Sequence, residues 1–254
     1  MIRVVFNRKG GVGKSSITCN LAAVAASKGI STLVVDLDAQ ANATSYLGHN
    51  GKDGVVGIAE FFESTLEYKY RDFLPKDFAR TTPFANLSLI SANADLADLE
   101  QKLQSRHKIY KLKGFLDQLS EHYDQILIDT PPALNFYSLS ALIAADRCLI
   151  PFDCDAFSRD ALMDLIGTLE EVREDHNADL QIEGVVINQF LQRAKVPQMA
   201  VDELKKADLP IMEPYLSSSV KMKESHAKNK PLIYLEKGHK LSQEFVELYD
   251  NLSA

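Results

Sequence analysis

A glycine-rich turn near the start of the chain carries the residues best suited to chemistry. An apolar, β-branched segment at residues 2–7 leads into the string KGGVGKSS, which holds three glycines within four residues. Glycines let backbone N–H groups approach an anion closely, and the helix expected from Lys14 onward adds its partial positive charge. Lys14 can reach phosphate oxygens there, and the Ser15 hydroxyl can bind Mg²⁺. The pattern predicts a site for a phosphate chain.

This string departs from the standard phosphate-loop spacing, G-x-x-x-x-G-K-[ST], at its first position. That spacing requires a glycine at position 8, where the chain has Arg8. The alternative interpretation is a glycine-rich strand-to-helix turn that binds nothing. Because the remaining glycines, the lysine and the serine stand between an apolar strand and a helix, phosphate binding remains the prediction.

Three carboxylates close two other apolar segments that are expected to be strands. Asp36 and Asp38 stand at the end of STLVVDLD (31–38), and Asp129 ends ILID. A lone carboxylate at the end of an apolar strand is costly to bury unless it is paired or lies near a metal. The alternative for Asp36 and Asp38 is a helix cap or a solvated turn.

The elements that must position these residues alternate between strands and helices along the chain. Ser158 is a candidate N-cap for one of the helices. The alternation predicts one α/β domain over residues 1–254, in which a mostly parallel, twisted sheet of about seven or eight strands has helices on both faces. Ligands of such sheets bind outside the carboxyl ends of the strands. The clearest strands are expected at 2–7, 31–38, 87–92, 124–132, 147–152 and 180–190.

Composition excludes several classes of protein. Hydrophobic residues make up 46% and charged residues 25% of the 254 residues, which is ordinary for a soluble globular chain. The three cysteines form no C-x-x-C pair; they are Cys19, Cys148 and Cys154. A disulfide framework or zinc ribbon is therefore not expected, and a cytoplasmic location is the expectation. The chain has no apolar run of about 18 residues, and its apolar start precedes Arg8, the reverse of a signal peptide.

Positive charge is concentrated in one segment of an acidic chain. The net charge is −7, yet residues 191–240 hold ten Lys and Arg against six Asp and Glu. One interpretation is a solvated lysine-rich surface, and the other is a patch that binds nucleic-acid phosphates. The candidate DNA-binding residues are Arg193, Lys221, Lys223, Lys228 and Lys230.

Three motifs together resemble one family. KGGVGKSS resembles the deviant Walker A motif of the ParA/MinD ATPases, a branch of the P-loop NTPases. STLVVDLDAQANAT resembles the family's switch I, with Ala39 where a proline is usual, and ILIDTPPA resembles its Walker B and switch II segment. The motifs occur in family order, and the resemblance covers essentially the whole chain.

The resemblance implies that the chain binds ATP and Mg²⁺ and forms a nucleotide-sandwich homodimer. Lys9 would be the signature lysine that reaches the partner's ATP, and Asp38 would position or activate the attacking water. Asp36 would lie near Mg²⁺ through water, and Asp129 would contact its outer coordination shell. The implied catalytic residues are Lys9, Lys14 and Asp38, and the implied metal-site residues are Ser15, Asp36 and Asp129. The implied nucleotide-binding residues are Lys9, Gly10, Gly11, Val12, Gly13, Lys14, Ser15, Ser16, Asn188 and Pro214.

Asn188 and Pro214 are the less specific members of this set. The family often uses an asparagine and a proline at these positions to contact adenine. The alternative is an asparagine at a strand end and a proline in a turn. ATP rather than GTP is therefore an implication of the resemblance and not of a base-reading motif.

Four branches of the family are distinguishable. A DNA-partition ATPase fits the basic segment. A MinD-like membrane regulator needs a basic amphipathic C-terminal helix, but the helix expected near residues 239–252 has acids on its polar face. An iron–sulfur carrier needs paired cysteines, and a metabolic ligase usually has further domains. A helix-turn-helix is not expected, because about eight residues precede the phosphate-loop lysines.

The prediction is therefore a partition or positioning ATPase. The resemblance implies ATP-dependent homodimers, non-specific binding to double-stranded DNA on the nucleoid, and slow ATP hydrolysis stimulated by a partner protein. The cargo would be a plasmid, a chromosome origin or a protein assembly.

Overall fold

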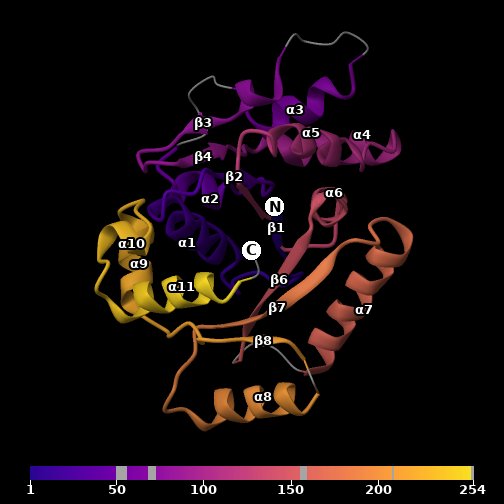
Figure 1. Cartoon of the computed structure of the whole chain (residues 1–254). Helices are drawn as coiled ribbons and strands as arrows, with labels where there is room; N and C mark the ends of the chain where they lie inside the picture. Colours follow the sequence, from indigo (N-terminus) through magenta and orange to yellow (C-terminus); the bar gives the residue numbers. More distant parts are fainter. Residues whose placement is uncertain (50–55, 68–72, 155–158, 208, 253–254) are drawn as a thin grey trace.

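The computed structural model describes residues 1–254 except 50–55, 68–72, 155–158, 208 and 253–254 (Figure 1). Ser158, the candidate N-cap, therefore lies outside the described residues. In the described part, eight strands form one sheet in the order β3-β4-β2-β5-β1-β6-β7-β8. The strands are β1 Ile2–Val5, β2 Thr32–Asp36, β3 Arg80–Thr81, β4 Leu87–Ile90, β5 Gln125–Asp129, β6 Arg147–Asp153, β7 Gln181–Asn188 and β8 Ile211–Met212.

Parallel pairing dominates this sheet. Neighbouring strands run parallel except β3 and β4, which are antiparallel. Every residue of β1 and β2 is buried, as expected for strands covered on both faces. The predicted fold class, a mostly parallel α/β sheet of seven or eight strands, is confirmed.

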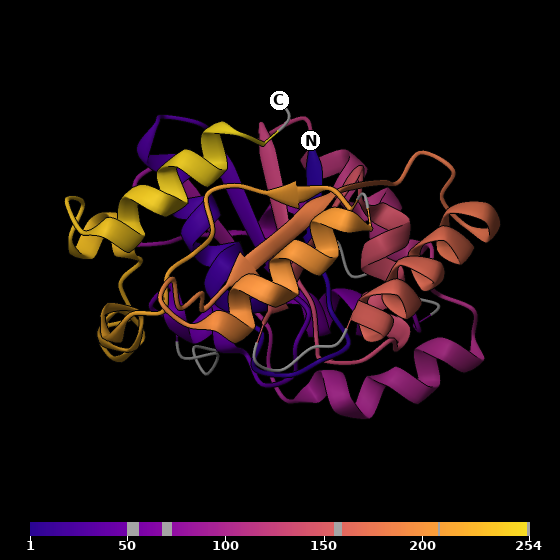
Figure 2. The same ribbon diagram turned by 90° about the horizontal axis from the view of Figure 1, so that it is seen from below.

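Helices cover both faces of the sheet. Side chains of a strand alternate between faces, so Leu33 and Val35 of β2 join one core and Val34 joins the other. Helices α3 to α8 contribute to the first core, and α1, α2, α10 and α11 contribute to the second. Figures 1 and 2 show α7 and α11 on opposite sides of the sheet. The helices are α1 Lys14–Ser27, α2 Asn42–Tyr46, α3 Ile58–Ser64, α4 Asp95–Ser105, α5 Lys111–Leu119, α6 Phe136–Ala144, α7 Arg159–Asp175, α8 Lys195–Lys206, α9 Val220–Ala227, α10 Leu232–Leu235 and α11 Lys240–Asp250.

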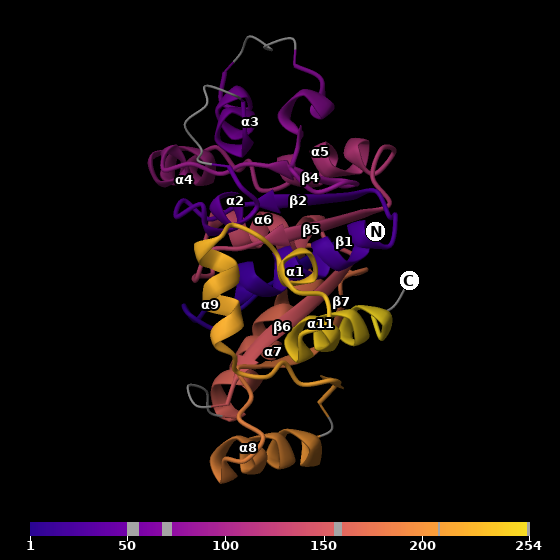
Figure 3. The same cartoon turned by 90° about the vertical axis from the view of Figure 1, so that its left-hand side faces the viewer.

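The loops that carry the predicted site follow the carboxyl ends of parallel strands. Strands β1, β2 and β5 are adjacent, and each leads into one of the three sequence motifs. Helix α8 lies beyond the edge strand β8 (Figures 1 and 3). Among the described helices, none combines the length and apolar character that crossing a membrane requires.

Candidate functional site at the carboxyl edge of the sheet

The loop between β1 and α1 has the backbone of a phosphate cradle. Gly11 and Gly13 have φ angles of 79° and 93°, in the left-handed region that favours glycine. A Cβ atom on Gly13 would lie 2.2 Å from Nδ2 of Asn188, so the packing of β7 against the loop also requires glycine there. The same Nδ2 donates a hydrogen bond to the Val12 carbonyl at 2.9 Å. Strand β7 thus fixes the shape of the loop.

Lys14 begins α1 and is largely buried at the centre of the site. Its Nζ donates a hydrogen bond to the Lys9 carbonyl at 2.8 Å, which folds the side chain back over the loop. Burial lowers the pKa of Lys14, and the nearby carboxylates of Asp129 and Asp38 oppose that shift. The ammonium therefore lies among the loop carbonyls and these acids, where a phosphate could compete for it.

Asp36 anchors the segment that follows β2. Its Oδ1 accepts a hydrogen bond from the Asp38 amide at 3.0 Å, and its Oδ2 accepts from the Thr44 amide and hydroxyl, both at 2.8 Å. Burial raises the pKa of Asp36 to about 6, although these hydrogen bonds oppose the shift. Asp36 holds the segment 37–44 in shape, and its proposed water-mediated contact with Mg²⁺ stays a prediction.

Asp129 ends β5 directly beside Asp36 in the parallel register. It is fully buried, and apart from the nearby Ser15 hydroxyl its carboxylate oxygens have no hydrogen-bond partner among the described residues. Burial, followed by the charge of Asp36, raises the pKa of Asp129 well above its usual range, while the nearby Ser15 hydroxyl lowers it. A buried carboxylate without a partner is costly unless a cation approaches it.

The donors present fit Mg²⁺. This cation prefers oxygen ligands, keeps several waters and is commonly bound through one or two carboxylates together with phosphates. The Ser15 hydroxyl and the Asp129 carboxylate supply hard oxygen donors beside the phosphate cradle, and Asp38 adds negative charge nearby. A magnesium ion would relieve the unpaired charge of Asp129 and would neutralise phosphate oxygens during hydrolysis.

We expect Asp129→Asn to stabilise the metal-free protein at pH 8, by about 1 kcal/mol or more. The pKa of Asp129 is raised by folding. Its contribution to stability is therefore fully present below the ordinary carboxyl pKa and is lost as pH rises through the folded pKa. Urea unfolding between pH 4 and 8 should show a flatter pH dependence for the variant. A variant less stable than the parent at pH 8 would contradict the assignment of an unpaired buried charge.

Asn188 contacts the loop, and Pro214 lies just beyond the strand that pairs with β7. Asn188 ends β7, and Pro214 follows β8, the strand that pairs with β7, in a cis peptide with Glu213. The structure gives Asn188 a role that the sequence did not reveal, the hydrogen bond to the Val12 carbonyl. Adenine contact by these two residues stays a prediction.

Lys9 and Ser16 flank the cradle. The Lys9 amide donates to Oδ1 of Asn7 at 3.0 Å, which fixes the entry to the loop. The Ser16 hydroxyl shares a hydrogen bond of 2.8 Å with Nε2 of His226, a residue of α9. This contact is not predictable from sequence, since the two residues are 210 positions apart.

The candidate DNA-binding residues differ in their surroundings. Lys221 is one quarter exposed and forms ion pairs with Glu224 at 2.8 Å and Glu236 at 3.1 Å, so it is tied to the protein. The other four side chains are exposed. They are Arg193, Lys223, Lys228 and Lys230.

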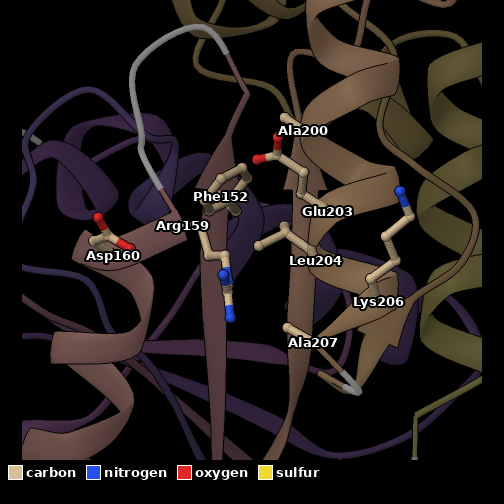
Figure 4. Close-up of a pocket in the computed structure, with 8 residues that line it drawn as sticks. All are labelled: Phe152, Arg159, Asp160, Ala200, Glu203, Leu204, Lys206 and Ala207. Atoms are coloured by element: carbon tan, nitrogen blue, oxygen red, sulfur yellow. The ribbon is translucent and has the colours of Figure 1, made fainter.

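A cavity of about 570 Å³ lies apart from the phosphate cradle, between the end of β6, the start of α7 and helix α8 (Figure 4). Phe152 and Leu204 supply apolar surface, and Arg159, Glu203 and Lys206 supply charge. The described residues that line it include none of the predicted site residues. The cavity is therefore separate from the nucleotide site.

Comparison with known proteins agrees with this geometry. A family model described as "AAA domain" matches residues 1–182. The chain is 33% identical over 231 residues to the chromosome partitioning protein ParA of Myxococcus xanthus, covering 90% of this chain and 79% of that protein. It is 30% identical over 255 residues to the sporulation initiation inhibitor protein Soj of Bacillus subtilis, covering 100% and 98%. The chain belongs to the ParA/MinD family of P-loop ATPases. A structure with the same fold, cobyrinic acid a,c-diamide synthase of Mycobacterium smegmatis, was solved with an ATP analogue and magnesium.

Solved structures share the fold of this chain. Apo McdA of Cyanothece has a TM-score of 0.85 at 24% identity, covering 98% of this chain and 97% of that chain. Cobyrinic acid a,c-diamide synthase of Mycobacterium smegmatis with bound ADP and magnesium has a TM-score of 0.83 at 25% identity, covering 98% and 92%. Chain length therefore does not separate this ParA/MinD-family protein from a synthase, contrary to the expectation that a metabolic relative would have further domains.

Proposed function

We propose that the chain is a single-domain partition or positioning ATPase that forms a homodimer with ATP, binds double-stranded DNA non-specifically and hydrolyses ATP slowly. A partner protein would stimulate hydrolysis, and the protein would act on the nucleoid in the cytoplasm. The observation that carries the proposal is the position of the basic helix α9. It joins the start of α1 through the hydrogen bond between Ser16 and His226, and it carries the exposed Lys223 one turn before His226.

ATP-dependent dimerisation would make the affinity for DNA depend on the bound nucleotide, because a dimer makes twice as many phosphate contacts as a monomer. If each protomer makes about three phosphate contacts, raising salt from 50 to 200 mM weakens a monomer about 40-fold and a dimer about 10³-fold. A dimer that separates after hydrolysis would therefore release DNA. The similarity to the partitioning proteins ParA and Soj supports this function over a synthase.

The membrane-regulator alternative needs a free amphipathic helix, and α11 does not offer one. Its apolar side chains Leu241, Phe245 and Leu248 are buried in the core that contains α1. Glu244 of the same helix accepts hydrogen bonds from the amide and hydroxyl of Ser217, at 2.8 and 2.6 Å. Membrane insertion would expose this packed face and break these bonds.

The test of DNA binding uses random-sequence duplex DNA with ATP, ADP or no nucleotide at the two salt concentrations. Tight, salt-sensitive binding with ATP alone supports the proposal. Lys223→Glu should weaken that binding at least about tenfold, since it replaces a phosphate contact with a repulsive charge. Lys113→Glu is the matched control, because Lys113 is also exposed but lies on α5, which packs on the opposite face of the sheet. Absence of binding in every state, with ATP turnover intact, would refute DNA binding.

We also expect Lys9→Gln to bind ATP but not to dimerise. Lys9 would act across the dimer interface, so its loss should affect the association of two protomers more than the nucleotide affinity of one. Light scattering with a non-hydrolysable ATP analogue gives the mass in solution, and a binding assay on the same sample gives the affinity. An ATP-dependent dimer of normal stability would remove Lys9 from the signature-lysine role.

A further inference from the structure

Helix α9 is attached to the nucleotide loop and to switch I by a polar cluster. The imidazole of His226 shares a hydrogen bond with the Ser16 hydroxyl and stacks on the ring of Tyr46, with centroids 4.0 Å apart and an interplanar angle of 19°. Ser16 lies at the start of α1, and Tyr46 ends α2. Figures 1 and 3 show α9 beside both helices.

A second path runs through the Tyr46 hydroxyl. The Ser225 hydroxyl donates to the Lys230 carbonyl at 2.5 Å, so it must accept the proton of the Tyr46 hydroxyl, which lies 2.5 Å away. The Tyr46 oxygen in turn accepts a hydrogen bond from Nδ2 of Asn20 at 3.0 Å. The chain of donors therefore runs in one direction, from α1 through α2 to the backbone that follows α9.

Helix α2 is itself part of the nucleotide site. Thr44 stands two residues before Tyr46 and donates two hydrogen bonds to Asp36, and its hydroxyl accepts one from the Ala92 amide at 2.9 Å. Asp36 also holds the amide of Asp38. Any movement of the segment 37–44 when nucleotide binds must therefore act on the ring against which His226 is stacked.

Helix α9 has little apolar anchoring of its own. Among its eight residues only Ser225 is fully buried, and Met222 is a partly buried side chain that packs against the core on the α1 face. A helix held mainly by polar contacts is positioned by those contacts, because few buried apolar groups oppose a shift. Burial lowers the pKa of His226, so its imidazole is neutral at neutral pH and can bond to a neutral hydroxyl without leaving a buried charge.

We propose that His226 is a positioning residue that couples the nucleotide site to α9. Through Ser16 it follows the phosphate loop, and through Tyr46 it follows switch I, so the position of α9 depends on whether ATP is bound. The coupling itself requires ATP binding alone, and its consequence for DNA affinity rests on the proposed function. Thermodynamic linkage is reciprocal. If ATP binding favours one position of α9 by a given factor, a contact that holds α9 in that position raises the affinity for ATP by the same factor.

The test measures amide hydrogen exchange of residues 219–230 with and without MgATP. The parent protein should show slower exchange in this segment with MgATP, by about fivefold or more, the low end of measured couplings. His226→Phe keeps a ring to stack on Tyr46 but removes the hydrogen bond to Ser16, and should lose most of the response. Tyr234→Phe is the matched control, since it removes a buried hydroxyl from α10 that has no partner among the described residues.

Two comparisons separate coupling from mere stability. Exchange of α9 in nucleotide-free His226→Phe shows whether the helix still folds; if it does not, His226→Gln, which can restore the bond to Ser16, should recover the response. A parent helix that ignores MgATP, or a His226→Phe helix that responds as the parent does, would overturn the proposal. An ATP response of α9 in a protein that binds no DNA would leave the coupling standing and refute the proposed function.

Discussion

Replacing Lys14 with alanine is expected to abolish measurable ATP binding. Its ammonium is held over the cradle by the Lys9 carbonyl and lies near Asp129 and Asp38, in a largely buried position. A hydrogen bond to a charged group contributes about 1.5–3 kcal/mol, so loss of two bonds to phosphate oxygens costs roughly 3–6 kcal/mol. That corresponds to a loss of affinity of about 10²- to 10⁴-fold. The variant also leaves two carboxylates facing the phosphates without their compensating cation.

Calorimetric titration with MgATP measures this loss directly. Lys28→Ala is the matched control, because Lys28 caps the other end of α1 and forms an ion pair with the exposed carboxylate of Asp250. It should bind ATP as the parent protein does. The thermal unfolding of both variants shows whether the fold is retained. Binding by folded Lys14→Ala within about threefold of the parent would exclude Lys14 from phosphate contact.

The parts of the site that sequence predicted are those encoded locally. Buried strands are visible in the sequence as apolar runs. The glycines between β1 and α1 indicate a turn with left-handed backbone, which the structure shows at Gly11 and Gly13. Asp36 and Asp129 are candidates on sequence alone because each stands at the end of an apolar strand. The two carboxylates are neighbours because β2 and β5 are adjacent and pair in parallel register. The order of strands in the sheet cannot be predicted from the local sequence around either residue.

Contacts between residues far apart in the sequence are not predictable from the local pattern. Asn188 shapes the cradle through the Val12 carbonyl, and His226 reaches Ser16, although each pair is separated by most of the chain. Nothing in the neighbouring residues of His226 distinguishes it from a surface histidine. Helix α2 is hard to predict for a different reason, because five residues are too short to establish a helical period.

The basic segment shows the limit of reading charge from sequence. Sequence predicts Lys221 as a DNA-binding residue because it lies in the basic segment 191–240. In the structure it is paired with Glu224 and Glu236, so DNA would have to compete with two carboxylates for it. Lys223, two residues away on the same helix, is exposed and is the sharper target for mutation.

Replacing Asp38 with alanine is expected to leave ATP-bound dimers that persist. Asp38 lies just beyond the end of β2, where its amide bonds to Asp36 and its Oδ1 accepts from the Gln40 amide at 2.9 Å. Ala41, at the end of this turn, has a left-handed φ of 53° and its amide bonds to the Asp38 carbonyl. The carboxylate is thus held rigidly near Lys14, as a residue that positions water for phosphoryl transfer must be. Its loss should slow ATP hydrolysis roughly 10²-fold or more.

The decisive feature of Asp38→Ala is the separation of binding from turnover. Lys14, Ser15 and the cradle are untouched, so ATP affinity should change little while phosphate release in single-turnover assays slows. Asp117→Ala, which removes an exposed carboxylate from α5, is the control and should hydrolyse ATP normally. Normal turnover by Asp38→Ala would remove the residue from its assigned role. Loss of ATP binding would instead show that Asp38 acts by holding the fold of switch I, because its backbone and side chain both take part in that turn.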